Sequence, residues 1–325
     1  MTAYLIRRLL QAALVVVAMS ILVFIGVYAI GDPVEILISP EADQIERERA
    51  IQALGLDKPL WMQYLVFVVK ALQGDLGNSF VYAEPALKLI LHRMPATLEL
   101  AFAALILVIV VGIPLGLYAG LKPNSPISRA IMAGSIFGFS LPTFWVGLML
   151  IMVFAVELKI LPSTGRGETA TLFGVAWSFL TWDGLRHMIL PALNLSLFKI
   201  SLVIRLTRSG VCETILMDYV KFARAKGLSP SRVIGVHVLK NIMIPVITVT
   251  GLEFGSTIAF SVVTETVFAW PGMGKLIIDS INVLDRPVIV AYLMMVTLMF
   301  IIINLVVDLG YSALDPRVRL TSQGT

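Results

Sequence analysis

Six long stretches with almost no charged side chain dominate this sequence. A helix needs about 20 apolar residues to cross a bilayer. Only 14% of the residues are charged and the mean hydropathy is +0.90, whereas a soluble domain has about 25% charged residues. The pattern predicts an all-α integral membrane protein, with one transmembrane domain over residues 1–325. The six spans are expected at residues 9–31, 100–121, 130–156, 187–206, 241–264 and 287–307.

The first of these stretches has one feature of a signal peptide. Arg7 and Arg8 precede it, as basic residues precede the apolar core of a secretory signal. However, the apolar core of a signal peptide is only about 7–15 residues long, and no small-residue cleavage site follows this longer stretch. We therefore expect a first span that is retained.

The distribution of charge predicts the orientation of the spans. If the amino terminus is cytoplasmic, the pieces on that side carry 13 Lys and Arg against 4 Asp and Glu, and the opposite side carries 11 against 16. Cytoplasmic loops of membrane proteins are enriched in Lys and Arg. Both termini are therefore expected in the cytoplasm, and residues 32–99 are expected to form a long external loop.

The external segments contain three local signals. Glu46–Ile51 is expected to be a short solvated helix, and Trp61–Leu72 has the aromatic and apolar character of a segment at the bilayer interface. Trp270-Pro271-Gly272 requires a turn. Two interpretations of that turn stay open, a re-entrant or interfacial elbow and a plain connecting loop.

A basic segment, residues 207–240, separates the fourth and fifth spans. Thr207–Lys226 contains good helix formers, and Gly227 can end that helix in a left-handed cap. Ser229 is suited to be the N-cap of a second helix, with Pro230 at its first position. The charges alone are explained by the preference for basic cytoplasmic loops. The small residues and the capped corner instead favour a compact knob that fits a partner's groove.

The same segment carries a resemblance. Ala223-Arg224-Ala225-Lys226-Gly227, followed by Asn241 and Pro245, resembles the cytoplasmic signature of membrane subunits of ATP-binding-cassette (ABC) importers, and most closely their dipeptide, oligopeptide and nickel branch. The similarity extends over nearly the whole chain. Its other motifs are Gly31-Asp32-Pro33, Leu54-Gly55-Leu56-Asp57-Lys58-Pro59, Gly74-Asp75-Leu76-Gly77, Pro95-Ala96-Thr97-Leu98-Glu99-Leu100, Glu265–Gly272, Asn304–Asp308 and Asp315-Pro316-Arg317.

The chain departs from the general importer signature in two places. That signature begins with Glu-Ala-Ala, whereas Lys221-Phe222-Ala223 fills these positions here. The signature's proline lies thirteen residues after its glycine, whereas Pro245 lies eighteen residues after Gly227. The variant resembles the peptide branch, and the individual docking contacts stay open.

The resemblance implies a fold like that of type I ABC importers, with a cytoplasmic coupling helix between spans 4 and 5. It also implies four kinds of partner: a second permease subunit, two ATP-binding subunits, an extracytoplasmic solute-binding protein and membrane lipid. ATP and Mg²⁺ would be bound by the partner ATPases, and this chain would hold no cofactor. The expected ATPase-coupling residues are Asp218, Tyr219, Lys221, Ala223, Arg224, Ala225, Lys226, Gly227, Ser229 and Arg232.

The sequence lacks the motifs of an enzyme that would use ATP itself. It has no G-x-x-x-x-G-K-[ST] phosphate loop, and Gly272-Met273-Gly274-Lys275 is followed by Leu276. The single cysteine, Cys212, excludes an intrachain disulfide, and the three histidines show no metal-binding spacing. We therefore predict that the chain is not catalytic and binds no metal.

Lys199 and Glu253 lie near the middle of two consecutive spans. A charge at the bilayer centre costs at least about 2.5 kcal/mol unless it faces water or a partner. Three hypotheses stay open. The two residues form an ion pair that locks helix packing, or they line the solute pathway and meet the ends of a zwitterionic solute, or each has a separate partner.

The sequence thus favours a permease subunit of an ATP-driven importer in the bacterial inner membrane, with a di- or oligopeptide as the expected solute. Nickel chelates, glutathione-like molecules and oligosaccharides stay open as solutes. The alternative from another class is a secondary transporter driven by an ion gradient, with Lys199 and Glu253 as coupling charges. Inverted repeats would favour that alternative, and none is visible in the sequence.

Overall fold

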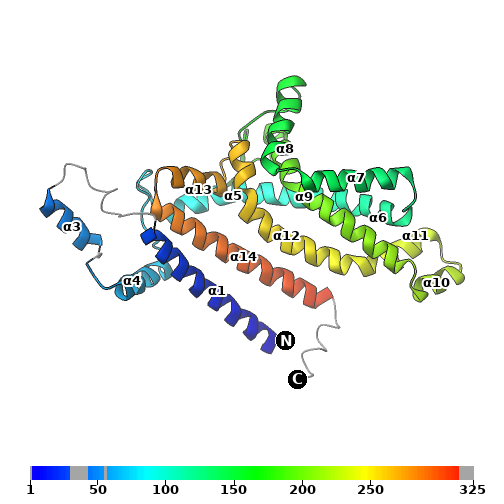
Figure 1. Ribbon diagram of the computed structural model, residues 1–325, viewed down its shortest axis with the longest axis horizontal. Coiled ribbons are helices and arrows are strands. Elements are labelled where there is room, and N and C mark those ends of the chain that lie inside the picture. The colour runs from blue at the N-terminus through cyan, green and yellow to red at the C-terminus, as the bar shows by residue number, and fades with distance from the viewer. Residues whose placement is uncertain (1, 30–42, 55–56, 315–325) are drawn as a thin grey trace. The chain divides into compact units, whose positions relative to one another are not determined.

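A computed structural model describes residues 2–29, 43–54 and 57–314, which are mostly helical (Figure 1). The chain divides into two compact units: Met1–Met94 with Lys275–Ile301, and Pro95–Gly274 with Ile302–Thr325. Each unit is described by itself below as unit 1 and unit 2. The motif Gly31-Asp32-Pro33, residues 55–56 and the terminal motif Asp315-Pro316-Arg317 lie outside the described residues.

Unit 1 combines the first helices of the chain with helices from near its end. Ser20 on α1 hydrogen-bonds the Tyr64 hydroxyl of α4 at 2.8 Å, and Phe24 packs edge-on against the Tyr64 ring. The expected solvated helix is α3, and the expected interfacial segment is α4, in which no residue is fully buried. The helices of unit 1 are α1 (Thr2–Ala29), α3 (Gln44–Leu54), α4 (Leu60–Leu72), α13 (Met273–Asn282) and the first parts of α5 (Ala86–Leu107) and α14 (Arg286–Leu314).

Unit 2 is built around one long helix, α9 (Trp182–Thr214). The sequence starts this helix at Thr181, whose hydroxyl accepts from Gly184 N at 3.0 Å as an N-cap. Most other helices of the unit contact α9. These other elements are η1 (Val108–Gly112), α6 (Ile113–Leu121), α7 (Pro126–Ser140), α8 (Thr143–Leu150), η2 (Ile151–Glu157), β1 (Ala170–Leu172), β2 (Val175–Trp177), α10 (Asp218–Ala225), α11 (Pro230–Arg232), η3 (Val233–Leu239) and α12 (Lys240–Val267).

Three glycines at four-residue intervals let α6 approach α9 closely. A Cβ on Gly116 would lie 2.7 Å from the Ile204 carbonyl oxygen, and one on Gly120 would lie 2.5 Å from Val211 Cβ. Gly112, one turn earlier, lies against Val203 in the same way. Small residues at this spacing let membrane helices pack at short distance. These glycines therefore let α6 and α9 pack in close contact.

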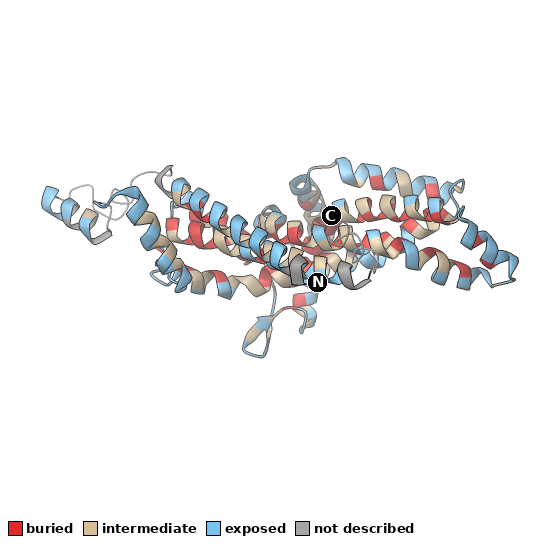
Figure 2. Cartoon of the chain, turned by 90° about the horizontal axis from the view of Figure 1, so that it is seen from below, coloured by how far each residue is buried: buried red, intermediate tan, exposed pale blue. Residues whose placement is uncertain are grey.

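In the described part of the chain, five helical stretches are long and apolar enough to cross a bilayer: Ile6–Gly26, Ala86–Leu121, Trp182–Thr214, Pro230–Val267 and Arg286–Gly310. Many of their apolar residues are exposed, as lipid-facing helices require, and Figure 2 shows exposed residues along the helices. A sixth candidate is the pair Pro126–Ser140 and Thr143–Glu157, which is bent by 109°. The expected third span, residues 130–156, is therefore not one continuous helix. Pro142 explains the break, because proline lacks the amide hydrogen that would continue α7.

Residues 157–186, between the expected third and fourth spans, contain structure that the sequence signals did not indicate. Strands β1 and β2 form a short antiparallel hairpin with Thr171 opposite Ala176. Phe173 and Gly174 make its turn with φ angles of 53° and 77°, as two-residue hairpin turns require. Side-chain hydrogen bonds of Arg166, Thr181 and Arg186 hold other parts of this segment.

Candidate functional site

The basic segment between α9 and α12 folds into a corner anchored on its inner face. Val220 and Ala223 of α10 are buried, with exposed fractions of 0% and 4%. They pack in one cluster with Val211, Val233 and Val238. Because both sides of the corner share this cluster, α10 is fixed to the C-terminal end of α9 and to the η3 segment by apolar packing.

The outer face of the corner combines cations with exposed aromatic rings. Phe222 is 62% exposed, and Lys226 Nζ lies 4.6 Å from the centre of its ring. Tyr219 is half-exposed, and its hydroxyl accepts a hydrogen bond from Asn241 Nδ2 at 3.0 Å. The other expected coupling residues on exposed positions are Asp218, Lys221, Arg224, Ala225, Gly227, Ser229 and Arg232.

The positions of Gly227, Ser229 and Pro230 in the corner are as predicted, and the extent of the first helix is wrong. Gly227 adopts a φ of +73°, and Pro230 occupies the first position of the second helix. However, the single helix predicted over Thr207–Lys226 is interrupted, since α9 ends at Thr214 and α10 begins at Asp218. The chain must turn there to bury one face of α10. Ser229 occupies the N-cap position without a capping hydrogen bond from its side chain.

Ala223 has a different environment from the one expected. We expected it on the surface of a knob that enters a partner's groove, together with Ala225 and Gly227. The structure buries Ala223 against the chain's own η3 segment and leaves the other two exposed. Ala223 therefore anchors the corner, and its small size is explained by packing within the chain.

Lys199 and Glu253 are paired in the structure. Lys199 Nζ on α9 lies 2.7 Å from Glu253 Oε2 on α12, and the same amine donates to Ser256 Oγ at 2.9 Å. The side chains are 13% and 31% exposed, respectively. The hypothesis of separate partners is therefore wrong for this state of the chain. The pair is nevertheless open to one side and is not enclosed in a core.

The α7–α8 break lies against the α9 segment that carries Lys199. The ring of Phe139, near the end of α7, stacks on Phe198 with centroids 4.4 Å apart. The Arg205 guanidinium lies 4.5 Å from the Phe139 ring centre. Charged and aromatic side chains are thus grouped where the third candidate span is interrupted.

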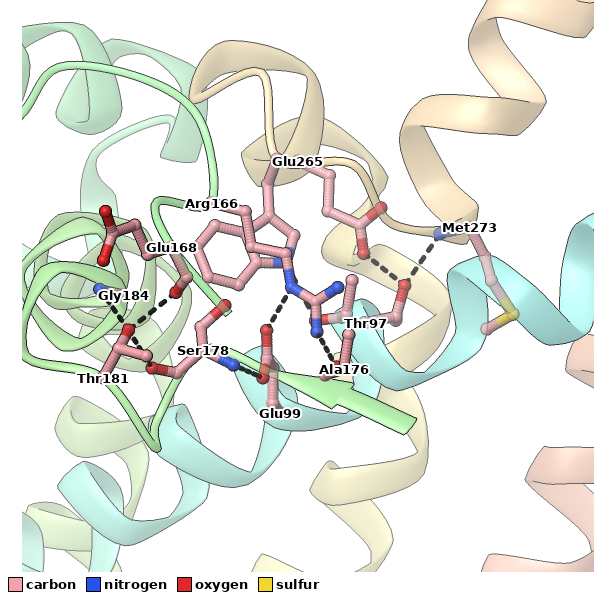
Figure 3. A network of polar contacts seen from close by, with 12 residues as sticks. Thr97, Glu99, Arg166, Glu168, Ala176, Ser178, Thr181, Gly184, Glu265 and Met273 are labelled. Atoms are coloured by element: carbon pink, nitrogen blue, oxygen red, sulfur yellow. Dashed lines mark hydrogen bonds and ion pairs between the residues drawn. The ribbon is translucent and has the colours of Figure 1, made fainter. Parts of the chain in front are cut away.

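A buried carboxylate on α5 holds the hairpin segment to the helices of unit 2 (Figure 3). The Glu99 side chain is 1% exposed, and Arg166 Nε donates to its Oε1 at 2.6 Å. Arg166 also donates to the Ala176 carbonyl at 2.7 Å, and Ser178 N donates to Glu99 Oε2 at 2.9 Å. The Glu99 carboxylate therefore binds residues on both sides of the hairpin, Arg166 before β1 and Ser178 after β2.

A second buried carboxylate holds the turn at the end of α12 (Figure 3). Glu265 is fully buried and accepts from Thr97 Oγ1 and Ser261 Oγ, both at 2.8 Å. Trp270, also fully buried, donates from its indole nitrogen to the Ala96 carbonyl at 2.8 Å. The turn is therefore part of the core of unit 2.

A cavity of about 640 Å³ lies between α5, α9 and the hairpin segment. Its walls are largely apolar and include Phe102, Ile106, Trp177 and Met188. Glu99 also borders it, but its carboxylate is already bound by Arg166 and Ser178. Among the residues that the structure describes, no group of three His, Cys, Asp or Glu is placed to hold a metal ion.

The long apolar helices, the anchored basic corner and the charged pair within two spans define a polytopic helical membrane protein. The chain belongs to the family of binding-protein-dependent transport system inner membrane components, which matches residues 112–320. The family of the N-terminal part of such membrane components matches residues 1–101. The resemblance to ABC importer permeases is therefore confirmed.

Relatives of known name extend over nearly the whole chain. The di/tripeptide transport system permease protein DppB of Pseudomonas aeruginosa is 42% identical over 302 residues, which cover 89% of this chain and 90% of that protein. The oligopeptide transport system permease protein AppB of Bacillus subtilis is 38% identical and covers 98% of this chain and 100% of its own length. The resemblance to the peptide branch is thus confirmed.

A solved structure supports the fold. The MetNI methionine ABC transporter, in an inward-facing conformation, matches 70% of this chain and 96% of its own chain with a TM-score of 0.53. The sequence identity is 15%, so the match concerns the fold alone. This chain therefore has the fold of an ABC transporter membrane subunit.

Proposed function

We propose that this chain is one of two related permease subunits of an ATP-driven importer, and that it forms half of the pathway for a di- or oligopeptide. The observation that carries the proposal is the nearly full-length similarity to permeases named for peptide transport. A glutathione-like molecule is the second candidate solute, because permeases named for glutathione transport are 38% identical over 98% of this chain. Nickel chelates and oligosaccharides stay open as solutes. An extracytoplasmic solute-binding protein would deliver the solute.

The energy for transport comes from two partner ATPases, which bind ATP and Mg²⁺, because this chain has no phosphate loop of its own. The corner from Asp218 to Arg232 docks on one of them. Its aromatic and basic outer face supplies the contact, and its apolar inner face passes the closure of the ATPases to α9 and α12. Aromatic residues and arginine are enriched among the residues that dominate protein interfaces.

The chain crosses the bacterial inner membrane six times in this proposal, and the bent pair α7 and α8 counts as one crossing. Both termini are cytoplasmic, as the excess of Lys and Arg predicts. The corner then faces the cytoplasm, and the β1–β2 hairpin faces the opposite side.

Reconstitution tests the proposed function directly. The chain, its companion permease and the two ATPases are placed in proteoliposomes with the solute-binding protein outside. We expect vanadate-sensitive ATP hydrolysis that the loaded binding protein stimulates, together with ATP-dependent uptake of a di- or oligopeptide. Uptake by this chain alone, driven by a proton or sodium gradient, would show a secondary transporter and overturn the proposal.

A further inference from the structure

Two exposed features of unit 2 are incompatible with contact to lipid. The first is the Lys199–Glu253 pair, whose carboxylate side chain is 31% exposed. Phe260, which follows Glu253 by about two helical turns on the same face of α12, is 77% exposed. Charged groups in the middle of a span face a water-filled path or protein. This face of α12 therefore does not face the acyl chains.

The second feature is the interrupted third span. Arg129 marks the cytoplasmic end of α7, and the break at Pro142 is about 20 Å away at 1.5 Å per residue. Pro142 and Thr143 at the break are exposed. Non-helical backbone at this depth is tolerated only where it is buried in protein or lines a water-filled cavity. The exposed side of the break therefore does not face lipid either.

The two features belong to one region of unit 2. Phe139 at the end of α7 stacks on Phe198, the neighbour of Lys199, and Gly138 lies against the hydroxyl of Ser201. The break and the charged pair are therefore at a similar depth along α9. Interrupted helices near the bilayer midplane form solute sites in other classes of transporter.

We propose that the α7–α8 break and the Glu253 face of α12 form the solute-facing wall of this subunit, and that Lys199 and Glu253 bind the two ends of a zwitterionic peptide. The inference rests on the proposed function, which supplies the peptide. Glu253 takes the terminal ammonium, and Lys199 takes the terminal carboxylate. While the path is empty, the two side chains neutralise each other, so no isolated charge is left within the membrane.

The pair is suited to this exchange because of its environment. Ser256 Oγ accepts from Lys199 and also lies within 3.0 Å of Glu253 Oε2, so either residue retains a polar neighbour when the pair separates. Because the pair is partly exposed, separating Lys199 from Glu253 costs less than in a closed core, where loss of one partner costs about 3–5 kcal/mol. An ion pair that only holds two helices together would not require this exposure.

Cysteine labelling in the assembled complex tests the wall. Cys212 is the chain's single cysteine, so Cys212→Ser gives a cysteine-free background. Thr143→Cys and Phe260→Cys are then labelled in membrane vesicles with a charged, membrane-impermeant methanethiosulfonate. The matched control is Ile247→Cys, which is 44% exposed on the same helix and about 120° around it from Glu253.

We expect both wall cysteines to react more than about tenfold faster than Ile247→Cys, because the thiolate is the reactive form and requires water. Equal slow labelling at all three positions overturns the proposal. Fast labelling at only one of the two wall positions overturns it as well, since both positions belong to the same wall.

Uptake in proteoliposomes tests which end of the peptide Glu253 binds, and it separates this inference from the proposed function. Glu253→Gln should lower uptake of a free peptide by about tenfold, the value of one lost charged contact, and should lower uptake of the N-acetylated peptide much less. An equal loss for both peptides overturns the role of Glu253. If the unmodified complex takes up no peptide while both wall cysteines react quickly, the peptide function is wrong and the wall remains.

Discussion

Gly116 of α6 lies against Ile204 of α9 so closely that a Cβ at position 116 would be 2.7 Å from the Ile204 carbonyl oxygen. The obstacle is backbone, which cannot move aside as a flexible side chain can. This backbone contact limits how closely a larger residue at position 116 would let the two helices approach.

Gly116→Ala should therefore force α6 away from α9 and lower the stability of the purified chain by about 1–3 kcal/mol, the usual cost of overpacking. The measurement is thermal unfolding in detergent. Gly134→Ala on α7 is the matched control, because nothing lies within 4 Å of its added Cβ. It should be neutral or stabilising by up to about 1 kcal/mol. Equal effects of the two substitutions would contradict close packing at Gly116.

Glu99→Gln should release the hairpin segment, because Arg166 then loses its charged partner while it is 14% exposed. Breaking a buried pair in this way costs about 3–5 kcal/mol. We expect a lower unfolding temperature and faster proteolysis between β1 and β2. Glu84→Gln removes an exposed pair with Lys88 and serves as control, with an expected cost of about 0–1 kcal/mol. Unchanged proteolysis in Glu99→Gln would exclude the carboxylate as the anchor.

Phe222→Ala should separate coupling from folding. Its side chain is 62% exposed, so the thermal stability of the chain should hardly change. Loss of an interface hot spot costs at least about 2 kcal/mol, so ATPase subunits should copurify poorly and ATP-dependent uptake should fall by more than tenfold.

The buried side of the same corner provides the contrast. Val220→Ala removes apolar volume from a fully buried position and should destabilise the chain by about 1–3 kcal/mol. A Phe222→Ala variant that retains full transport and ATPase binding would place the docking contact elsewhere on the chain.

Replacing both members of the Lys199–Glu253 pair distinguishes a pathway role from a structural lock. The double variant Lys199→Gln, Glu253→Gln leaves no unpaired charge in the membrane. Its assembly and thermal stability should therefore be close to those of the unmodified complex. Uptake of a free peptide should stay low, because the charged contacts are absent. Recovery of both stability and uptake would support a lock only.

The local chemistry of the corner was predictable from the sequence. A glycine, a serine and a proline close together within a run of helix formers predict the end of one helix and the start of another. Gly227 ends the first helix and Pro230 occupies the first position of the second. The interruption at Thr214 was not predictable from propensity. It depends on the burial of Val220 and Ala223 against residues more distant in the chain.

Two other differences have separate causes, one local and one tertiary. Pro142 was the visible signal for a break in the third span, but its apolar surroundings favoured continuity. Glu265 directly follows the expected fifth span, 241–264, and hydroxyls from α5 and α12 keep its carboxylate buried. Charge alone therefore predicts exposure poorly where distant residues supply hydrogen bonds.

The hairpin has a practical consequence. Phe173 at its tip is 96% exposed, whereas the base of the segment is tied to a buried carboxylate through Arg166 and Ser178. The backbone at the tip is thereby tied to the helices of unit 2, so a fluorophore or spin probe attached there would follow the movement of this unit. The turn at Phe173 and Gly174 is thus a ready attachment point for distance measurements on a working transporter.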